Sequence, residues 1–218
     1  MSALAKHLAR GLDVRHDVEV SRILRVGDEW EVLTGTETYR ATRVILTTPA
    51  PQIGPLIGQD HALAKRIATV RMAPCLTLMV AFGADGPTPG FAARRNKHDP
   101  IAWIADNSSK PGRPGPGAWV AQAGPVWSAD NLERDKDDVA QLMLPMLCAR
   151  LGAEPAMAVH VAAHRWRYAM VTEPLGQSFV RDKTGTLYFG GDWCLGARVE
   201  AAWTSGTAIA RDILATER

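Results

Sequence analysis

Two glycines and an acid near the C-terminus are the strongest chemical signal in this sequence. Residues 187–192 read LYFGGD, and a loop leads from there to a helix expected from about Val199 to Leu214. Glycines let a backbone approach a ligand closely, and a carboxylate accepts hydrogen bonds from sugar hydroxyls. The start of a helix offers unpaired N–H groups and a partial positive charge. The unit suits a phosphate- or flavin-bearing ligand, but a buried strand–turn–helix explains it equally well, so this pattern alone does not decide.

The expected C-terminal helix carries apolar or small residues at intervals of three and four. They are Val199, Ala202, Trp203, Gly206, Ile209, Ala210, Ile213 and Leu214. This spacing predicts one buried stripe whose small residues allow close packing.

Two further runs contain side chains that could bind a ligand. Residues 164–168 read HRWRY, and side chains alternate between the two faces of a strand. We take Arg165, Arg167 and Tyr168 as candidates for contact with a substrate, although a polar strand face needs no substrate to explain it. Residues 94–98 read RRNKH, which is typical of a solvated loop. If the substrate is a pyridine nucleotide, this run could instead meet a phosphate.

The N-terminal part, residues 1–64, predicts a helix followed by strands. The helix should run from Ser2 to about Arg10, with Gly11 after its end. Strand-like runs at 17–26, 30–34 and 42–48 suggest a β-meander, and apolar residues 44–48 indicate a fully buried strand. The prolines at 49, 51 and 55 predict a loop after it.

The remainder divides into a central part, residues 65–168, and a C-terminal part, residues 169–218. The central part should hold strands at 75–82, 101–105, 118–123 and 159–166, with a helix at 135–151 that Pro145 would kink. We therefore expect an α/β (mixed α+β) fold in which both chain ends form one part and an α+β module is inserted between them.

Whole-chain properties exclude several classes of protein. Lys plus Arg is 25, Asp plus Glu is 23 and the net charge is +2, which gives no reason to expect nucleic acid or an anionic membrane as partner. There is no continuous apolar run long enough for a membrane helix and no signal peptide, so we expect a cytoplasmic protein. The three cysteines and six histidines fit no metal or redox spacing, and no metal is expected.

Several stretches together resemble the amine-oxidase-type flavoproteins. Residues 187–193 (LYFGGDW) and 198–206 (RVEAAWTSG) are similar to the C-terminal flavin-binding motif of that family, in the form found in its renalase-like branch. Residues 164–169 (HRWRYA) resemble a strand near the active site of that branch. Residues 44–52 (VILTTPAPQ) resemble the strand that passes the cofactor pyrophosphate. The resemblance extends over essentially the whole chain.

The resemblance implies non-covalently bound FAD and gives the C-terminal motif a role in holding it. Asp192, with Gly191 before it, would hydrogen-bond the ribityl or pyrophosphate region. Val199, Glu200 and Ala201 would place the start of the helix beside the isoalloxazine ring. Negative charge develops on a reduced flavin, and a helix start would stabilise it.

The N-terminal part would contribute two more cofactor contacts under this resemblance. The backbone of Val20 would meet the adenine, and Thr47, Thr48 and Pro49 would lie near the diphosphate. A place in the core of the sheet explains Val20 and the threonines at least as well.

The resemblance implies an oxidoreductase that oxidises a small reduced substrate by hydride transfer, with oxygen as acceptor giving hydrogen peroxide. The renalase-like motif favours isomeric dihydropyridine forms of NAD(P) as substrate, and an amine is the second choice. The flavin performs the chemistry, so no catalytic acid or base is assigned.

Such flavoproteins open with a strand, a Gly-x-Gly-x-x-Gly turn and a helix, and these 218 residues contain no such motif. A truncated or misassigned start, a split gene or a degenerate paralogue would each account for this. The alternative function is therefore a flavin-free, inactive fragment or a self-associating structural module. We expect the chain alone to bind FAD poorly and to self-associate through an unpaired strand edge at 44–48.

Overall fold

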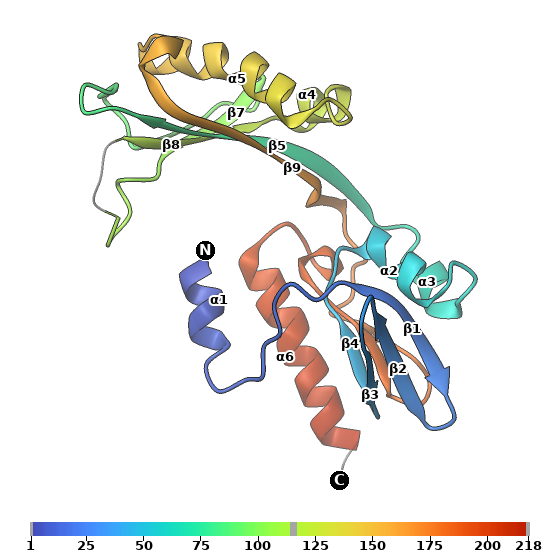
Figure 1. Ribbon diagram of the computed structural model, residues 1–218. Helices are drawn as coiled ribbons and strands as arrows, with labels where there is room; N and C mark the ends of the chain where they lie inside the picture. Colours follow the sequence, from blue (N-terminus) through green and yellow to red (C-terminus); the bar gives the residue numbers. More distant parts are fainter. Residues whose placement is uncertain (1, 114–116, 217–218) are drawn as a thin grey trace. The chain divides into compact units, whose positions relative to one another are not determined.

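The computed structural model describes residues 2–113 and 117–216, which form two compact units of mixed α/β structure (Figure 1). One unit combines both chain ends, up to Thr69 and from Leu175 onward, and the other comprises Val70–Pro174. The boundaries predicted from the sequence were 64/65 and 168/169. A module inserted between two chain ends is the arrangement that the sequence predicted.

The unit built from both chain ends contains three short helices, six strands, a 3₁₀ turn and a long C-terminal helix. In chain order these are α1 (Ser2–Leu8), β1 (Val20–Val26), β2 (Glu29–Thr34), β3 (Thr38–Ala41), β4 (Val44–Leu46), α2 (Ala50–Ile57), α3 (Ala62–Arg66), β10 (Val180–Arg181), β11 (Leu187–Phe189), η2 (Asp192–Cys194) and α6 (Val199–Thr216).

The antiparallel meander is present, but its third strand is not the expected one. Strands β1, β2 and β3 pair in that order, and Gly27 takes a left-handed conformation (φ 59°) in the first turn. The third strand is the short polar β3, which alternates exposed and half-buried residues and escaped notice for that reason. The apolar run that follows belongs to a different sheet.

That second sheet joins segments that are distant in the sequence. Strand β4 pairs in parallel with β11, and β10 pairs with β11 on its other side. All three residues of β11 are fully buried, as a central strand requires. In β4 Val44 and Leu46 are buried but Ile45 is 46 % exposed, so the prediction of a fully buried strand was wrong at Ile45.

The prolines after β4 do not form the predicted loop. Pro49 precedes helix α2, which holds Pro51 in its first turn and Pro55 inside. Proline is tolerated at a helix start because the first N–H groups have no partner within the helix. The buried side chain of Ile53 anchors this helix in the unit.

The inserted unit is an antiparallel sheet with helices on one face. Its elements are β5 (Arg71–Phe82), β6 (Ala93–Arg95), β7 (Ile101–Asp106), β8 (Ala118–Ala123), α4 (Pro125–Asp130), α5 (Lys136–Leu151), η1 (Pro155–Met157) and β9 (Ala158–Glu173). The strand order is β6-β7-β8-β5-β9. Strand β6 covers Arg94 and Arg95, so the prediction of a loop was wrong for these two residues.

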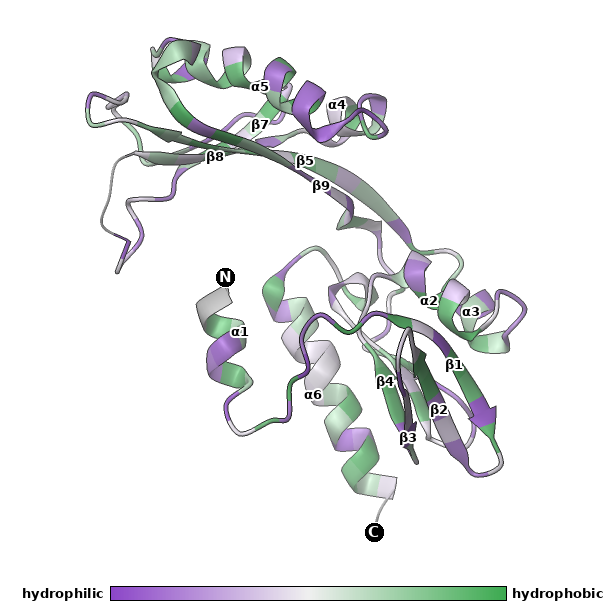
Figure 2. Ribbon diagram, viewed as in Figure 1, coloured by the Kyte–Doolittle hydropathy of each residue, from purple (hydrophilic) through white to green (hydrophobic). Residues whose placement is uncertain are grey.

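Helix α5 packs on this sheet through a core of alternating strand residues. Leu76, Leu78, Val80 and Phe82 of β5 are buried on the same side, against residues such as Met143 and Leu147 of α5. In Figure 2 green apolar residues run along β5, and α5 alternates between green apolar and purple hydrophilic residues. The opposite side of the sheet is called the α5-distal face below. None of the helices in the described residues is long and apolar enough to cross a membrane.

Candidate functional site

The glycine turn links the end of the parallel sheet to helix α6. The Gly190 amide donates to the carbonyl of Leu46 in β4 (3.0 Å), and the Gly191 amide donates to Oγ of Ser205 in α6 (3.0 Å). The indole of Trp193, in the 3₁₀ turn that follows, donates to the carbonyl of Thr48 (3.1 Å). These bonds fix the LYFGGD run and the threonines after β4 in one place.

Close packing explains why both positions in this turn are glycine. A Cβ on Gly190 would lie 2.6 Å from Cδ1 of Ile209 and 2.7 Å from Oγ of Ser205, so α6 could not approach. Gly191 has φ 153°, and a Cβ there would meet the Trp193 indole nitrogen at 2.7 Å. The glycines therefore serve the strand–helix contact whether or not a ligand binds.

A cavity of about 180 Å³ opens beside this turn. Its lining comes from the loop after β4, from the turn and from α6: Thr47, Gly190, Gly191, Asp192, Ala202, Ser205, Gly206 and Ile209. Asp192 is half-buried, and its carboxylate has no hydrogen bond or ion pair to another described residue. A carboxylate so placed can accept hydrogen bonds from a polyhydroxylated chain.

The hydroxyl of Thr48 is a second group that fits a ligand. Its Oγ1 is buried and has no hydrogen-bond partner in the described part of the chain. Buried hydroxyls in folded proteins nearly always have a partner, and an orphan calls for an explanation. A bound ligand with polar oxygens would supply that partner, as the sequence resemblance implies for Thr48.

Helix α6 begins as predicted, but it buries a different face. Arg198 caps the start, and its carbonyl accepts from the amides of Ala201 (3.0 Å) and Ala202 (3.4 Å). The first-turn residues Val199 and Glu200 are exposed, whereas Ala201 is buried.

The buried stripe of α6 consists of Ala201, Ser205 and Ile209. Of the eight residues in the predicted stripe only Ile209 is buried, and Ile213 is half-buried. The prediction was wrong at the six exposed positions: Val199, Ala202, Trp203, Gly206, Ala210 and Leu214. A polar residue, Ser205, occupies the centre of the true stripe because it bonds Gly191, and a pattern of apolar residues cannot reveal such a position.

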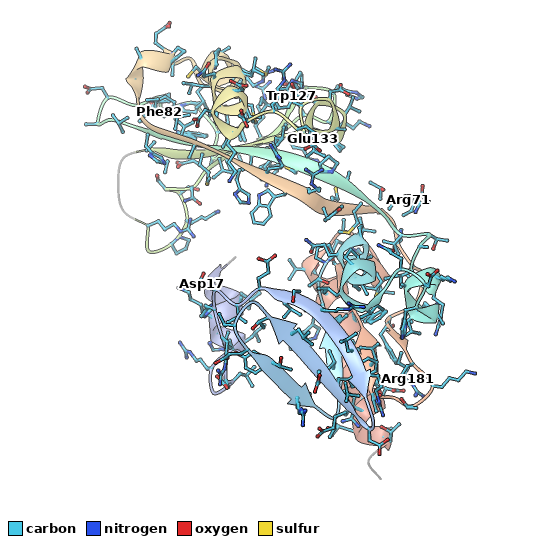
Figure 3. All side chains as sticks on the ribbon, turned by 45° about the vertical axis from the view of Figure 1, so that its right-hand side comes forward. Asp17, Arg71, Phe82, Trp127, Glu133 and Arg181 are labelled. Atoms are coloured by element: carbon cyan, nitrogen blue, oxygen red, sulfur yellow. The ribbon has the colours of Figure 1, made fainter. Side chains whose placement is uncertain are left out.

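Val20 begins strand β1 in the same unit. It pairs with Thr34 where a bulge shifts the β1–β2 register, and a second cavity, of about 460 Å³, adjoins it. Its lining is Asp17, Val18, Glu19, Ser21, Thr34, Gly35 and Thr36; Asp17 is labelled in Figure 3. Val20 does not line the cavity beside Asp192.

Two of the three substrate-side candidates in β9 are held by one carboxylate. Arg167 donates to both carboxylate oxygens of Glu133 (2.7 and 3.0 Å), and Arg165 lies 3.8 Å from Glu133 and also donates to the carbonyl of Arg134. Glu133 follows α4, where Figure 3 labels it. The hydrogen bonds from Arg167 lower the pKa of the Glu133 carboxyl despite the opposing desolvation. Tyr168 is half-buried and lies one residue farther along the strand.

Alternation along β9 places the neighbouring aromatic residues on the other side of the sheet. His164 pairs with Thr77 and Trp166 with Cys75, on the α5-distal face, and the two rings lie 4.3 Å apart. His164 and Trp166 were not among the predicted site residues, although period-two alternation along a strand separates them from Arg165 and Arg167.

The cysteines are neutral thiols. Burial raises the pKa of Cys75 and of Cys148, and it raises the pKa of Cys194 to about 11. A buried thiol of this kind is a poor nucleophile. Within the described residues, no group of three or more His, Cys, Asp or Glu side chains is arranged to hold a metal ion.

The sequence of this chain matches one protein-family model, and its fold matches several solved structures. The model of the family "Flavin containing amine oxidoreductase" matches residues 1–214. Similar solved structures include a protein assigned as a protoporphyrinogen oxidase from Exiguobacterium sp. 255-15 (TM-score 0.71, 16 % identity) and the cyclohexylamine oxidase of Brevibacterium oxydans IH-35A (TM-score 0.65, 14 % identity). A variant of putrescine oxidase is also similar (TM-score 0.67, 16 % identity).

These likenesses extend over nearly all of this chain but only half of each relative. The matches cover 98 %, 92 % and 98 % of this chain, and 51 %, 49 % and 52 % of the respective structures. At such low sequence identities these likenesses establish a shared fold and do not identify the substrate of this chain.

Proposed function

Because the chain belongs to the family of flavin containing amine oxidoreductases, we propose that it forms part of an FAD-dependent oxidoreductase of the renalase-like kind. Its substrate is a small reduced molecule, an isomeric dihydropyridine form of a nicotinamide nucleotide. The family match supports a flavin, and the HRWRYA and VEAAWTSG motifs support the finer assignment.

One observation carries this proposal: the cavity between the glycine turn and α6. It combines the unpaired carboxylate of Asp192 with close backbone at Gly190 and Gly191, while the orphan hydroxyl of Thr48 lies in the loop that Trp193 ties to the turn. In this proposal Asp192 and Thr48 hold the polar chain of FAD, and the first turn of α6, at Val199–Ala201, lies beside the ring. Val20 contributes a backbone contact to the adenine.

When bound, FAD would supply the two-electron chemistry, in which the dihydropyridine loses a hydride to become a pyridinium. Oxygen would accept the two electrons, one proton from that hydride and one proton from solvent, and leave as hydrogen peroxide. The residues of this chain bind and orient. The N–H groups at the N-terminus of α6 stabilise negative charge that develops close to them. No side chain is assigned as acid or base, since this reaction requires none.

Equilibrium dialysis of the purified chain against FAD tests the proposal. We expect weak flavin binding by the chain alone, detected as a shifted visible spectrum at high FAD concentration, and weaker binding still when Asp192 is replaced by Ala. FAD that stays wholly free at millimolar concentration, with the protein folded, would refute the proposal for this chain. Retention that is equal in Asp192→Ala and in the unaltered chain would remove Asp192 from the site.

An amine substrate is the second candidate within the same family. The named relatives include a cyclohexylamine oxidase and a putrescine oxidase, which favours amine chemistry by analogy. Hydrogen peroxide release with a panel of amines, compared with dihydropyridine nucleotides, separates the two substrates.

The alternative function is not enzymatic: the chain would serve as a self-associating structural module. Exposed apolar side chains on α6 favour it, since Val199, Trp203 and Leu214 are 47 %, 64 % and 62 % exposed. Exposed apolar clusters on folded proteins commonly mark contact surfaces. A homo-oligomer formed through this side of α6 is therefore proposed alongside the enzyme.

A further inference from the structure

A single row of side chains crosses all five strands of the inserted unit on the α5-distal face. Strand pairing aligns them in the order Arg95, Trp103, Gln122, Thr77 and His164. Residues directly opposite each other in antiparallel strands project from the same face. The row therefore presents a guanidinium at one edge, an indole and an amide next to it, and an imidazole at the far edge, whereas the Thr77 side chain between the amide and the imidazole is buried.

The neighbouring row on this face is small and apolar. It consists of Ala93, Ala105, Val120, Met79 and Ala162, each two residues from its counterpart in the first row. Trp103 is 37 % exposed, and at the other edge Trp166 stacks on His164 and is 54 % exposed. A smooth floor with accessible aromatic rings suits a planar conjugated ligand, which gains from offset stacking.

The charges on these two rows favour a ligand with an anionic group over a cationic one. Their only fully charged member is Arg95, which is exposed, and neither row contains Asp or Glu. A guanidinium pairs well with phosphate through two parallel hydrogen bonds. An ammonium group would find no carboxylate in these rows and would be repelled by Arg95.

Arg95 and Trp103 are direct partners on neighbouring strands, which lie roughly 4.8 Å apart. A ring stacked on Trp103 therefore leaves an attached phosphate within reach of Arg95. The adjacent Arg94 pairs with Ile104 on the opposite face, and its guanidinium lies 6.0 Å from the centre of the Phe91 ring. Arg94 and Arg95 therefore project from opposite faces of the sheet, and Arg94 serves as a matched control for Arg95.

We infer that the α5-distal face binds the substrate as a planar, uncharged ring that bears a phosphate, with Trp103 as the ring platform and Arg95 as the phosphate-binding residue. The inference rests on the proposed function and adds to it the residues that distinguish a phosphorylated dihydropyridine from an amine.

Calorimetric titration of the full chain under anaerobic conditions, without flavin, tests it. The probes are reduced nicotinamide mononucleotide, the corresponding riboside without phosphate, and benzylamine. We expect the nucleotide to bind about tenfold more tightly than the riboside, as one charge-assisted contact implies. Arg95→Gln should abolish that difference, whereas the matched control Arg94→Gln should preserve it.

Trp103→Leu should weaken both the nucleotide and the riboside about fivefold, the loss expected from one stacking contact, and Trp203→Leu on α6 should weaken neither. Equal affinity for nucleotide and riboside, tighter binding of benzylamine, no binding of any probe, or equal effects of Arg94→Gln and Arg95→Gln would each overturn the inference.

Flavin binding measured on the same samples separates this inference from the proposed function. Nucleotide binding that depends on Arg95, in a chain that does not take up FAD, supports the inference and counts against the oxidoreductase. FAD uptake with no preference for the phosphate overturns the inference and leaves the oxidoreductase in place.

Discussion

The amide of Gly191 donates a hydrogen bond to Oγ of Ser205 at 3.0 Å, which ties the glycine turn to the buried side of α6. Ser205 is fully buried, although it lies on a helix whose other buried residues are apolar. Because the same turn also bonds β4 through Gly190, this contact holds together one wall of the candidate cofactor cavity.

Replacing Ser205 by Ala should lower the free energy of unfolding by about 1–3 kcal/mol, because it leaves the Gly191 amide without its acceptor. Urea unfolding followed by circular dichroism measures this. The control is Thr204→Ala, one residue away on the exposed side of α6, where the hydroxyl bonds only the Glu200 carbonyl of its own helix. The control should change stability by less than about 0.5 kcal/mol. Equal effects of the two substitutions would show that the Gly191 bond contributes nothing.

Replacing Gly190 or Gly206 by alanine should change the stability of the folded chain in opposite directions. At Gly190 the new Cβ would meet Ile209 and Ser205 below 3.0 Å, and turning Ser205 aside would break its bond to Gly191. Gly190→Ala should therefore cost about 1–3 kcal/mol. At Gly206, in the middle of α6, the space is open, so Gly206→Ala should add roughly 0.5–1 kcal/mol through helix propensity. Thermal unfolding of both variants provides the comparison, and a stabilising Gly190→Ala would contradict the packing described here.

In flavin-loaded protein, Asp192→Ala should weaken FAD retention about ten- to a hundredfold. The reason is the loss of a charge-assisted hydrogen bond, which contributes roughly 1.5–3 kcal/mol. Dialysis followed by flavin absorbance is the measurement. Asp130→Ala, which removes an exposed carboxylate from the end of α4, serves as the control and should retain flavin normally.

The sequence predicted most of the regular structure because runs rich in apolar residues, bounded by glycine or proline, mark the segments that fold into strands and helices. The strands around Leu76–Phe82, the helix ending at Leu151 and the LYFGGD–helix unit all appear as expected. The glycine after that helix, Gly152, has the left-handed conformation typical of a helix end (φ 69°).

What the sequence missed depends on contacts between distant segments. Strand β3 and the Arg94–Arg95 strand carry no apolar signal and exist because they pair with a neighbour. Helix α2 forms in spite of its prolines because Ile53 is buried in the unit. The row from Arg95 to His164 gathers residues from five strands, so strand register, which no local pattern encodes, is needed to find it.

Asp99 should make the stability of the chain sensitive to acid. Burial acts to raise the pKa of its carboxyl, but the hydrogen bonds from Arg150 and the Ile101 amide prevail and hold the pKa below its usual 3.8. A lowered pKa contributes stability above the unfolded value and loses it as the pH falls through the folded value. Asp99→Asn should thus cost roughly 1–2 kcal/mol at pH 7 and much less below pH 3.8.

Chemical unfolding of both proteins at pH 7 and at pH 3 checks this. Asp60→Asn is the control, since Asp60 is fully exposed and lies 3.7 Å from Lys65. A penalty for Asp99→Asn that is the same at both pH values would refute the assignment of the Arg150 ion pair as the cause.

The chain should self-associate, and two exposed apolar positions should control the assembly. Ile45 lies in β4, which pairs with β11 and, in the described residues, with no other strand, and Trp203 lies on the exposed side of α6. An unpaired strand edge is a template for another chain, and a lysine there opposes pairing. Light scattering over a range of concentrations should show more than one subunit, and Ile45→Lys or Trp203→Ser should shift the population towards monomer.

Val126→Ser, which removes an isolated apolar side chain that is 76 % exposed on α4, should leave the assembly unchanged. A monomer at every concentration, or equal dissociation by Val126→Ser, would rule out Ile45 and Trp203 as interface residues.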